Sequence, residues 1–148
     1  MKAEMTPRER VMATLSLQEP DRVPIDLSQA AGDAITVTAY RNLLDHLGIK
    51  DREIKIQTKL SQTAVVDEDI LKKFRVDFRR LDLGVPDNWT DEPVGRDGYR
   101  DEYGLVRTRP EGGYYYDIVE SPIKEDTLDA IEKHRWPDPD DPGRYRGL

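Results

Sequence analysis

The fold is decided by the stretch EPDRVPIDLSQAAG, which spans residues 19 to 32. Residues that precede a proline avoid the α region, so Pro20 and Pro24 favour an extended segment from Arg22 to Leu27. A short apolar strand that runs into small and polar residues is how an α/β sheet or barrel brings a strand to a ligand site. The residues at 28–32 are then either the floor of an active site or only a loop.

Helices and strands alternate around this segment. A helix is expected at about 7–17, because Thr6 and Glu9 form a capping box and Pro7 suits the first helical position. The elements expected next are a helix at 34–47 closed by Gly48, a strand at 54–57, a helix at 67–74 and a weaker strand at 76–83. This order is typical of α/β winding.

The character of the chain changes after Gly84, where prolines and glycines break it into turns. A β-hairpin is expected, in which 99–108 faces 114–119 across the loop RPEGG, followed by a short helix capped by Asp126 or Thr127. The stretch WPDPDDPG at 136–143 predicts an extended, solvated linker. The sequence thus divides into first βα units at 1–83, a turn-rich hairpin and short helix at 84–135, and a linker at 136–148.

Length and composition limit the possible functions. A complete (β/α)8 barrel usually takes roughly 250 residues, and the chain has 148, so a barrel here is partial. The net charge is −7 with mixed signs and no basic block, which argues against nucleic acid as a partner. The chain has no cysteine, and it carries neither a signal-peptide pattern nor an apolar run long enough to span a membrane, so we expect a cytoplasmic protein.

Five segments carry a family resemblance by their order and spacing. They are TPRERV at 6–11, EPDRVP at 19–24, VDEDIL at 66–71, DEYG at 101–104 and WPDPDDP at 136–142. Together they resemble the amino-terminal part of the uroporphyrinogen decarboxylase superfamily, in particular its branch of corrinoid-dependent methyltransferases. The resemblance implies an α/β fold, the amino-terminal portion of a TIM (β/α)8 barrel, with 23–27 as the first barrel strand and the hairpin at 99–119 as an excursion.

The resemblance also suggests binding residues. The active site of such a barrel lies at the carboxyl ends of the strands, which puts Ser28 and Gln29 at its mouth. The family's decarboxylases have an arginine just before Gln-Ala-Gly, where it clamps substrate carboxylates, whereas this chain has Ser28. Asp82 is the nearest candidate for the aspartate that faces the pyrrole nitrogens in those enzymes. No catalytic residue is assigned.

The methyltransferases of this family use a zinc ion, which is bound by His and Cys residues from the later half of the barrel. This chain has no cysteine, and His46 and His134 lie near the ends of expected helices, where a positive charge is favourable. No metal site or cofactor is therefore expected in this chain, while the resemblance implies zinc and a corrinoid partner for the full protein.

The function that the resemblance implies is that of an amino-terminal segment of a methyltransferase, which contributes part of a barrel pocket for methyl transfer with a corrinoid protein. Its expected partners are the remainder of the barrel or a partner subunit, and a corrinoid protein, and the isolated chain is expected to be inactive. Two alternatives stay open: a uroporphyrinogen-type decarboxylase, and a non-catalytic α+β module that docks onto a partner subunit.

Three further groups have both a structural and a functional interpretation. Tyr114 to Tyr116 either pack within the hairpin or stack on a flat ligand. Asp67 to Asp69 either favour a helix start or bind a hard cation. Arg79 and Arg80 either form a surface pair or contact an anionic ligand at a strand end. In each case the structural interpretation is favoured.

Overall fold

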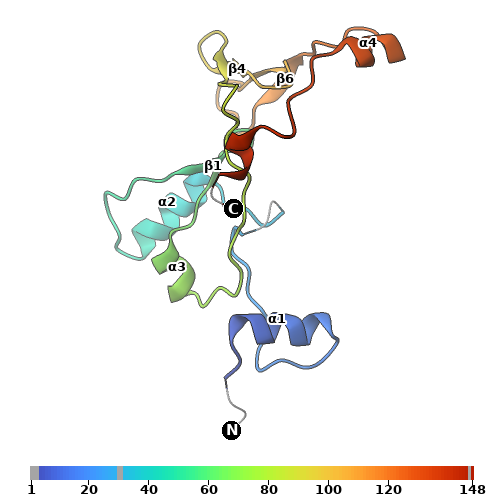
Figure 1. The fold of residues 1–148 in the computed structure, drawn as a ribbon. Helices are drawn as coiled ribbons and strands as arrows, with labels where there is room; N and C mark the ends of the chain where they lie inside the picture. Colours follow the sequence, from blue (N-terminus) through green and yellow to red (C-terminus); the bar gives the residue numbers. More distant parts are fainter. Residues whose placement is uncertain (1–3, 30–31, 147) are drawn as a thin grey trace. The chain divides into compact units, whose positions relative to one another are not determined.

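The computed structural model describes residues 4–29, 32–146 and 148, which form four α-helices, one 3₁₀ helix and two β-sheets (Figure 1). The chain divides into two compact units, Met1–Arg80 and Leu81–Leu148. The mixed α/β class expected from the sequence is confirmed. Among the described residues, no helix has the length and apolar character needed to cross a membrane.

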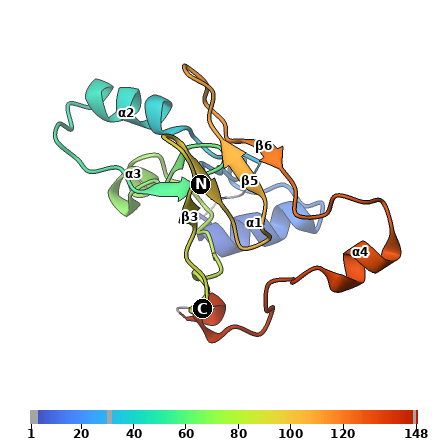
Figure 2. The same cartoon turned by 90° about the horizontal axis from the view of Figure 1, so that it is seen from above.

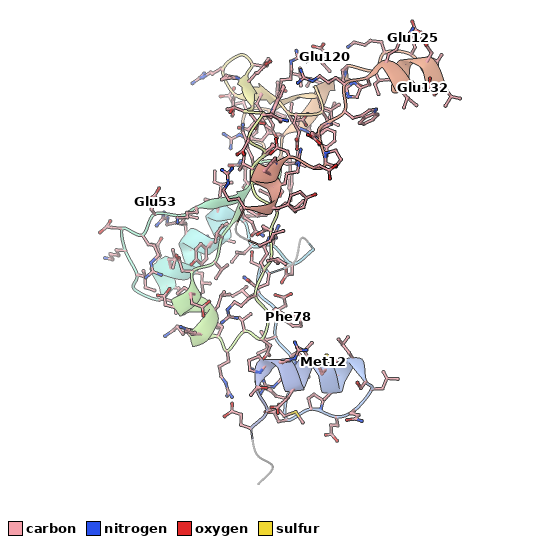
Figure 3. All side chains as sticks on the ribbon, in the orientation of Figure 1. Met12, Glu53, Phe78, Glu120, Glu125 and Glu132 are labelled. Atoms are coloured by element: carbon pink, nitrogen blue, oxygen red, sulfur yellow. The ribbon has the colours of Figure 1, made fainter. Side chains whose placement is uncertain are left out.

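The first helix, α1 (Pro7–Leu15), begins where the capping box predicts. The Thr6 hydroxyl accepts from the Glu9 backbone N–H at 3.3 Å, and the Glu9 carboxylate accepts from the Thr6 N–H at 2.8 Å. The apolar side chains of α1 are largely exposed to solvent. That of Met12, which is labelled in Figure 3, has an exposed fraction of 50%. Within α1, all of which is described, the one buried residue is Arg10. Ionic contacts rather than apolar packing therefore hold this helix.

The core of the first unit forms around α2 (Val37–His46) and α3 (Glu68–Lys73). Beside them lies an antiparallel pair of short strands, β1 (Ile56–Thr58) and β2 (Thr63–Ala64). The buried apolar residues are Tyr40, Leu44, Ala64, Val66, Ile70, Leu71 and Val76. As expected, α2 ends before Gly48, which takes a φ of +73°.

The strands expected at 22–27 and 76–83 do not form, and this is a correction. The Asp77 N–H donates to the Ile25 carbonyl at 2.9 Å, but the Ile25 N–H donates to the Asp77 carboxylate, also at 2.9 Å. A side chain thus takes the position of a backbone carbonyl. Because a ladder needs successive backbone bonds, the pairing does not extend into a sheet.

The second unit contains an antiparallel sheet in the order β3-β4-β5-β6. Figure 2 labels its strands β3, β5 and β6. Its strands are β3 (Glu92–Pro93), β4 (Gly98–Arg100), β5 (Val106–Thr108) and β6 (Asp117–Glu120). The pairing of β5 with β6 agrees with the expected hairpin. The expected strand at 99–108 is wrong, however, because a turn divides it: the Asp101 carboxylate accepts from the N–H groups of Tyr103 and Leu105, and Gly104 takes a φ of +76°.

The chain after the sheet is more ordered than a linker. Helix α4 (Leu128–Lys133) is capped by Thr127, whose hydroxyl accepts from the Ala130 N–H at 3.2 Å. A 3₁₀ helix, η1 (Pro142–Tyr145), lies within the expected linker. Its cap, Asp141, is only 3% exposed, which corrects the expectation that this residue is solvated. The reason is that its carboxylate accepts from three backbone N–H groups, those of residues 87, 88 and 143.

Candidate functional site

The predicted site loop begins at Ser28, which lies inside the first unit. Ser28 is 1% exposed, and its hydroxyl accepts from the Ile35 N–H at 3.0 Å and donates to the Ala64 carbonyl at 3.3 Å. Its φ of +60° lies in the left-handed region, which costs free energy for a residue with a Cβ. These two bonds hold Ser28 in that conformation and attach it to Ile35 and Ala64.

Gln29 joins the loop to the end of the second extended segment. Its side-chain amide donates to the Leu27 carbonyl at 3.0 Å and accepts from the Arg80 N–H at 2.9 Å. Ile25 is bonded to Asp77 earlier along the same segments. Since residue numbers rise together in both contacts, the two segments run side by side in the same direction.

Arg80 presents a positive charge at this loop. With the Gln57 amide in the orientation that its neighbours favour, its nitrogen donates to the Ala64 carbonyl at 2.9 Å. Its oxygen then accepts from Arg80 Nε at 2.9 Å and from Arg80 Nη1. Arg79, by contrast, is bound to Glu68 at 2.8 Å and also donates to the Val76 carbonyl. Of the two adjacent arginines, for which an anion contact was the less favoured interpretation, Arg80 is therefore the one held at the site.

Two carboxyl groups flank the loop, Asp26 before it and Asp33 after it. Burial, the hydrogen bond with Asp33 and the negative charge of Asp33 together raise the pKa of Asp26. Such a pair shares a proton more readily than two isolated carboxylates. The sequence analysis missed this pair, because only the return of the chain brings the two groups together. Ala30 and Ala31, in the middle of the predicted site, lie outside the described residues.

The predicted binding residues are thus brought together in part. Gln29 accepts from the Arg80 N–H, and Ser28 and Gln57 both donate to the Ala64 carbonyl. Asp82 is exposed and belongs to the second unit. The site that can be built from contacts therefore consists of residues of the first unit.

The other candidate groups have structural partners. Tyr116 packs edge to face on Tyr99, with 5.1 Å between ring centroids, and its hydroxyl donates to Asp97 at 2.6 Å. Its neighbours Tyr114 and Tyr115 are 64% and 56% exposed. The tyrosine run therefore contributes one packed ring to the second unit and leaves two rings at its surface.

The acidic run at 67–69 is also engaged. Asp69 accepts from Arg52 at 2.7 Å, and Asp67 accepts from the Tyr40 hydroxyl at 2.5 Å. Burial and the hydrogen bond with Asp67 raise the pKa of Tyr40 to about 12. These partners account for the run without a bound cation.

A hollow of about 630 Å³ also lies in the first unit, beside the end of α2. Its lining consists of three basic and three acidic side chains, those of Arg41, Asp45, Lys50, Asp51, Arg52 and Glu53. The opposite charges balance. None of these residues belongs to the segment from Asp26 to Asp33, the 26–33 loop. This hollow therefore adds nothing to the predicted site.

Comparisons of the chain with protein-family models, with curated proteins and with solved structures each gave no match. The part of the chain that the structure describes contains no group of three or more His, Asp or Glu side chains that could hold a metal ion. A zinc ion therefore does not fit these residues, and we assign no step to one. What the loop offers is a cation, a side-chain amide and the carboxyl group of Asp26, whose pKa is raised.

Proposed function

We propose that the chain is the amino-terminal segment of a uroporphyrinogen decarboxylase-like methyltransferase, in which the 26–33 loop and Arg80 form part of a barrel pocket for methyl transfer with a corrinoid protein. One observation supports this most: the segments at 25–29 and 77–80 run side by side in the same direction. Between them the chain contains α2, the β1–β2 pair and α3, and parallel segments joined through helices are typical of α/β folds.

In this proposal the residues of the loop bind and orient rather than react. Gln29 and Gln57 hold Arg80 in place, so its charge can steady an anionic part of a ligand. Asp26 lies at the edge of the loop, where burial and the neighbouring Asp33 raise its pKa. The methyl group would be carried by the corrinoid of the partner protein, and the residues of this chain would form a wall that positions it.

A decarboxylase is the second candidate, and Arg80 is the observation that keeps it open. Substrates with several carboxylate arms need cations at the pocket. Ser28 cannot supply one, and its hydroxyl is already engaged inside the loop. The methyltransferase is favoured because a single arginine is a poor clamp for many carboxylates. A non-catalytic module is the third candidate, since each unit has buried residues of its own.

The experiment is a titration followed by the backbone amide NMR signals of Gln29 and Arg80. Methylcobalamin and uroporphyrin I are added separately to the full chain. We expect methylcobalamin to shift both signals saturably, because both amides lie at the proposed pocket wall. The shift of the Arg80 signal should be lost in Gln29→Ala, and both shifts should be kept in Gln18→Ala, which changes an exposed glutamine outside the loop.

The other outcomes separate the candidates. Saturable shifts with uroporphyrin I alone would replace the methyltransferase with the decarboxylase. If neither probe shifts the signals and light scattering finds a monomer that unfolds in one cooperative transition, the proposal is overturned in favour of the non-catalytic module.

A further inference from the structure

The sheet of the second unit has an open edge at β6. In the order β3-β4-β5-β6 this strand pairs with β5 on one side, and no strand of the described residues lies on its other side. The opposite edge strand, β3, is shorter and contains Pro93, which has no N–H to donate. The β6 edge lies outside the 26–33 loop, so an inference about it does not rest on the function proposed above.

The register of the sheet directs the backbone groups of Ile118 towards this edge. At the two ends of the β4–β5 pair, the N–H groups of Asp101 and Arg109 donate across to the neighbouring strand, at 3.0 and 3.1 Å. Because bonded positions alternate along antiparallel strands, Arg107 also bonds towards β4. Arg107 lies opposite Ile118 in the next pair. The N–H and C=O groups of Ile118 therefore face away from β5, where another extended segment can pair with them.

The side chains of β6 are uncovered as well. Tyr99 of β4 and Val106 of β5 are buried, whereas all four residues of β6 are exposed. Its two apolar residues, Ile118 and Val119, are 54% and 59% exposed. Helix α4, which follows in the chain, has no buried residue and stands apart from the sheet in Figure 1. The strand therefore lacks both a neighbour at its edge and a cover over its apolar side chains within the described part of the chain.

The charges around β6 indicate which kind of segment fits this edge. Residues 117–126 carry four acidic side chains and one basic side chain, those of Asp117, Glu120, Glu125, Asp126 and Lys124. Glu120 and Lys124 are exposed and lie 3.7 Å apart, and an ion pair of this kind contributes little. A second copy of the chain would bring two acidic edges together, which like-charge repulsion disfavours. A basic segment would instead gain an attractive pair at each acidic position.

We propose that the open edge of β6 binds an extended basic segment of a partner protein, which adds to the sheet as a further antiparallel strand. The backbone of that segment bonds to the N–H and C=O groups of Ile118. Its lysines or arginines lie opposite Asp117 and Glu120, and its apolar side chains lie opposite Ile118 and Val119. The surface is one of recognition, and no chemical step is assigned to it.

The test follows the backbone amide NMR signals of the full ¹⁵N-labelled chain. The probe is the acetylated and amidated peptide Lys-Lys-Val-Ile-Lys-Thr, which in an antiparallel pairing sets its isoleucine opposite Ile118 and lysines opposite Asp117 and Glu120. We expect a saturable shift of the Ile118 signal, while the signal of Tyr99, in the interior of the sheet, stays in place. A peptide with glutamate at each lysine position should bind about tenfold more weakly, because attraction becomes repulsion.

A second peptide separates strand addition from general charge attraction. It keeps all the lysines but carries a methyl group on the backbone nitrogen of its isoleucine, so that this residue cannot donate to the Ile118 carbonyl. We expect it to bind about tenfold more weakly than the unmethylated peptide, because a backbone hydrogen bond is lost while the charge is unchanged.

Glu120→Lys and Glu132→Lys form a matched pair of variants, because each reverses one exposed acidic side chain of the same unit (Figure 3). Glu120 ends β6, whereas Glu132 lies on α4. We expect Glu120→Lys to weaken binding of the lysine peptide about tenfold and Glu132→Lys to leave it unchanged. The remaining amide signals show whether each variant keeps its fold.

The proposal is overturned if the lysine peptide gives no saturable shift of the Ile118 signal. It is also overturned if the methylated peptide binds equally well, or if the two variants bind alike. A dimer by light scattering, with the Ile118 amide protected from hydrogen exchange, would overturn it too, because a second copy would then cover the edge.

Discussion

Each of the two units of this chain is stabilised by different forces. The first has a cluster of seven buried apolar residues around α2 and α3. In the second, the buried apolar residues are Tyr99, Val106 and Tyr116. The charges differ as well: residues 1–80 carry 14 Lys and Arg against 13 Asp and Glu, and residues 81–148 carry 9 against 17. The net charges are therefore +1 and −8, within the total of −7.

The second unit depends on polar contacts to a greater degree. The Asp141 carboxylate holds three backbone N–H groups, and Glu102 pairs with Arg144. Both use charges within a unit that is already strongly acidic. We therefore expect a cavity to destabilise the first unit most. Acid should destabilise the second unit by protonating its carboxylates.

One feature of the first unit breaks this simple contrast, the buried charges beneath α1. Arg10 binds Asp21 at 2.6 Å and Asp77 at 2.5 Å, and Arg22 binds Asp77 at 2.7 Å. Burial alone would raise the pKa of Asp77, but hydrogen bonds from Arg22, Ile25 and Arg10 outweigh it and lower the pKa. The hydrogen bond from Arg10 is the main cause of the lowered pKa of Asp21.

The largest expected effect follows from breaking this network. Asp77→Asn leaves Arg22 without its counter-ion and the buried Arg10 with Asp21 alone, and we expect it to cost about 3 kcal/mol of unfolding free energy. Denaturant unfolding by far-UV circular dichroism follows the first unit, because α1, α2 and α3 supply most of the helix. Tryptophan fluorescence follows the second unit, which contains both Trp89 and Trp136.

The control for that variant is Glu53→Gln, which removes an exposed carboxylate of the same unit (Figure 3). It should change the unfolding free energy by less than about 0.5 kcal/mol. An equal loss in both variants would mean that net charge, rather than the Arg10 network, controls the stability of the first unit.

A cavity in the apolar core should have the next largest effect. Leu44 is fully buried, so Leu44→Ala should lower the unfolding free energy by about 3 kcal/mol. This value lies in the lower half of the range for such truncations. The circular-dichroism transition should move, with little change in tryptophan fluorescence. Leu15→Ala is the control, because that side chain is 71% exposed on α1. If both probes shift together in Leu44→Ala, the two units unfold as one and the contrast between them is wrong.

The acid response of the second unit should be smaller and should depend on Asp141. Hydrogen bonds from the N–H groups of Asp87, Gly143 and Asn88 lower the pKa of its carboxyl group. A lowered folded-state pKa stabilises the fold above the ordinary carboxyl range near pH 3.9, and this contribution is lost as pH falls through the folded value. Asp141→Asn should therefore lower the denaturant midpoint of the fluorescence transition at neutral pH. As the pH is lowered, this midpoint should then decrease less than that of the unchanged chain.

The matched control for Asp141 is Asp140→Asn, because Asp140 is the exposed neighbour in the same acidic stretch. Its fluorescence midpoint should follow the same acid curve as that of the unchanged chain. Identical curves for Asp141→Asn and Asp140→Asn would show that the buried carboxylate contributes nothing to the second unit.

The sequence predicted the features that local chemistry determines. The start of α1 at Thr6 and the end of α2 before Gly48 were correct, because caps depend on residues within one turn. The strand expected at 22–27 was wrong, because the Ile25 N–H donates to the carboxylate of Asp77, which is distant in the sequence. Tertiary contacts of this kind leave no local pattern.

The same division applies to the candidate site. Ser28 and Gln29 could be proposed because they follow one another after an apolar run. The bond that gives them context, from the Arg80 N–H to Gln29, joins residues 51 positions apart. The pairing of Asp26 with Asp33 likewise leaves no pattern in the sequence. Spacing alone could name the loop but not the groups that surround it.

The smallest predicted effect separates the two contacts that hold α1. Thr6→Ala removes the cap and should cost about 1 kcal/mol, measured by the circular-dichroism transition. Thr38→Ala, an exposed threonine within α2, should be neutral or slightly stabilising, since alanine favours a helix interior. Arg10 lies one turn after the cap and donates to the Met5 carbonyl at 2.6 Å, so the start of the helix is held twice. If Thr6→Ala changes nothing, the Arg10 contacts alone fix the start of α1, and the buried charges outweigh local capping in this unit.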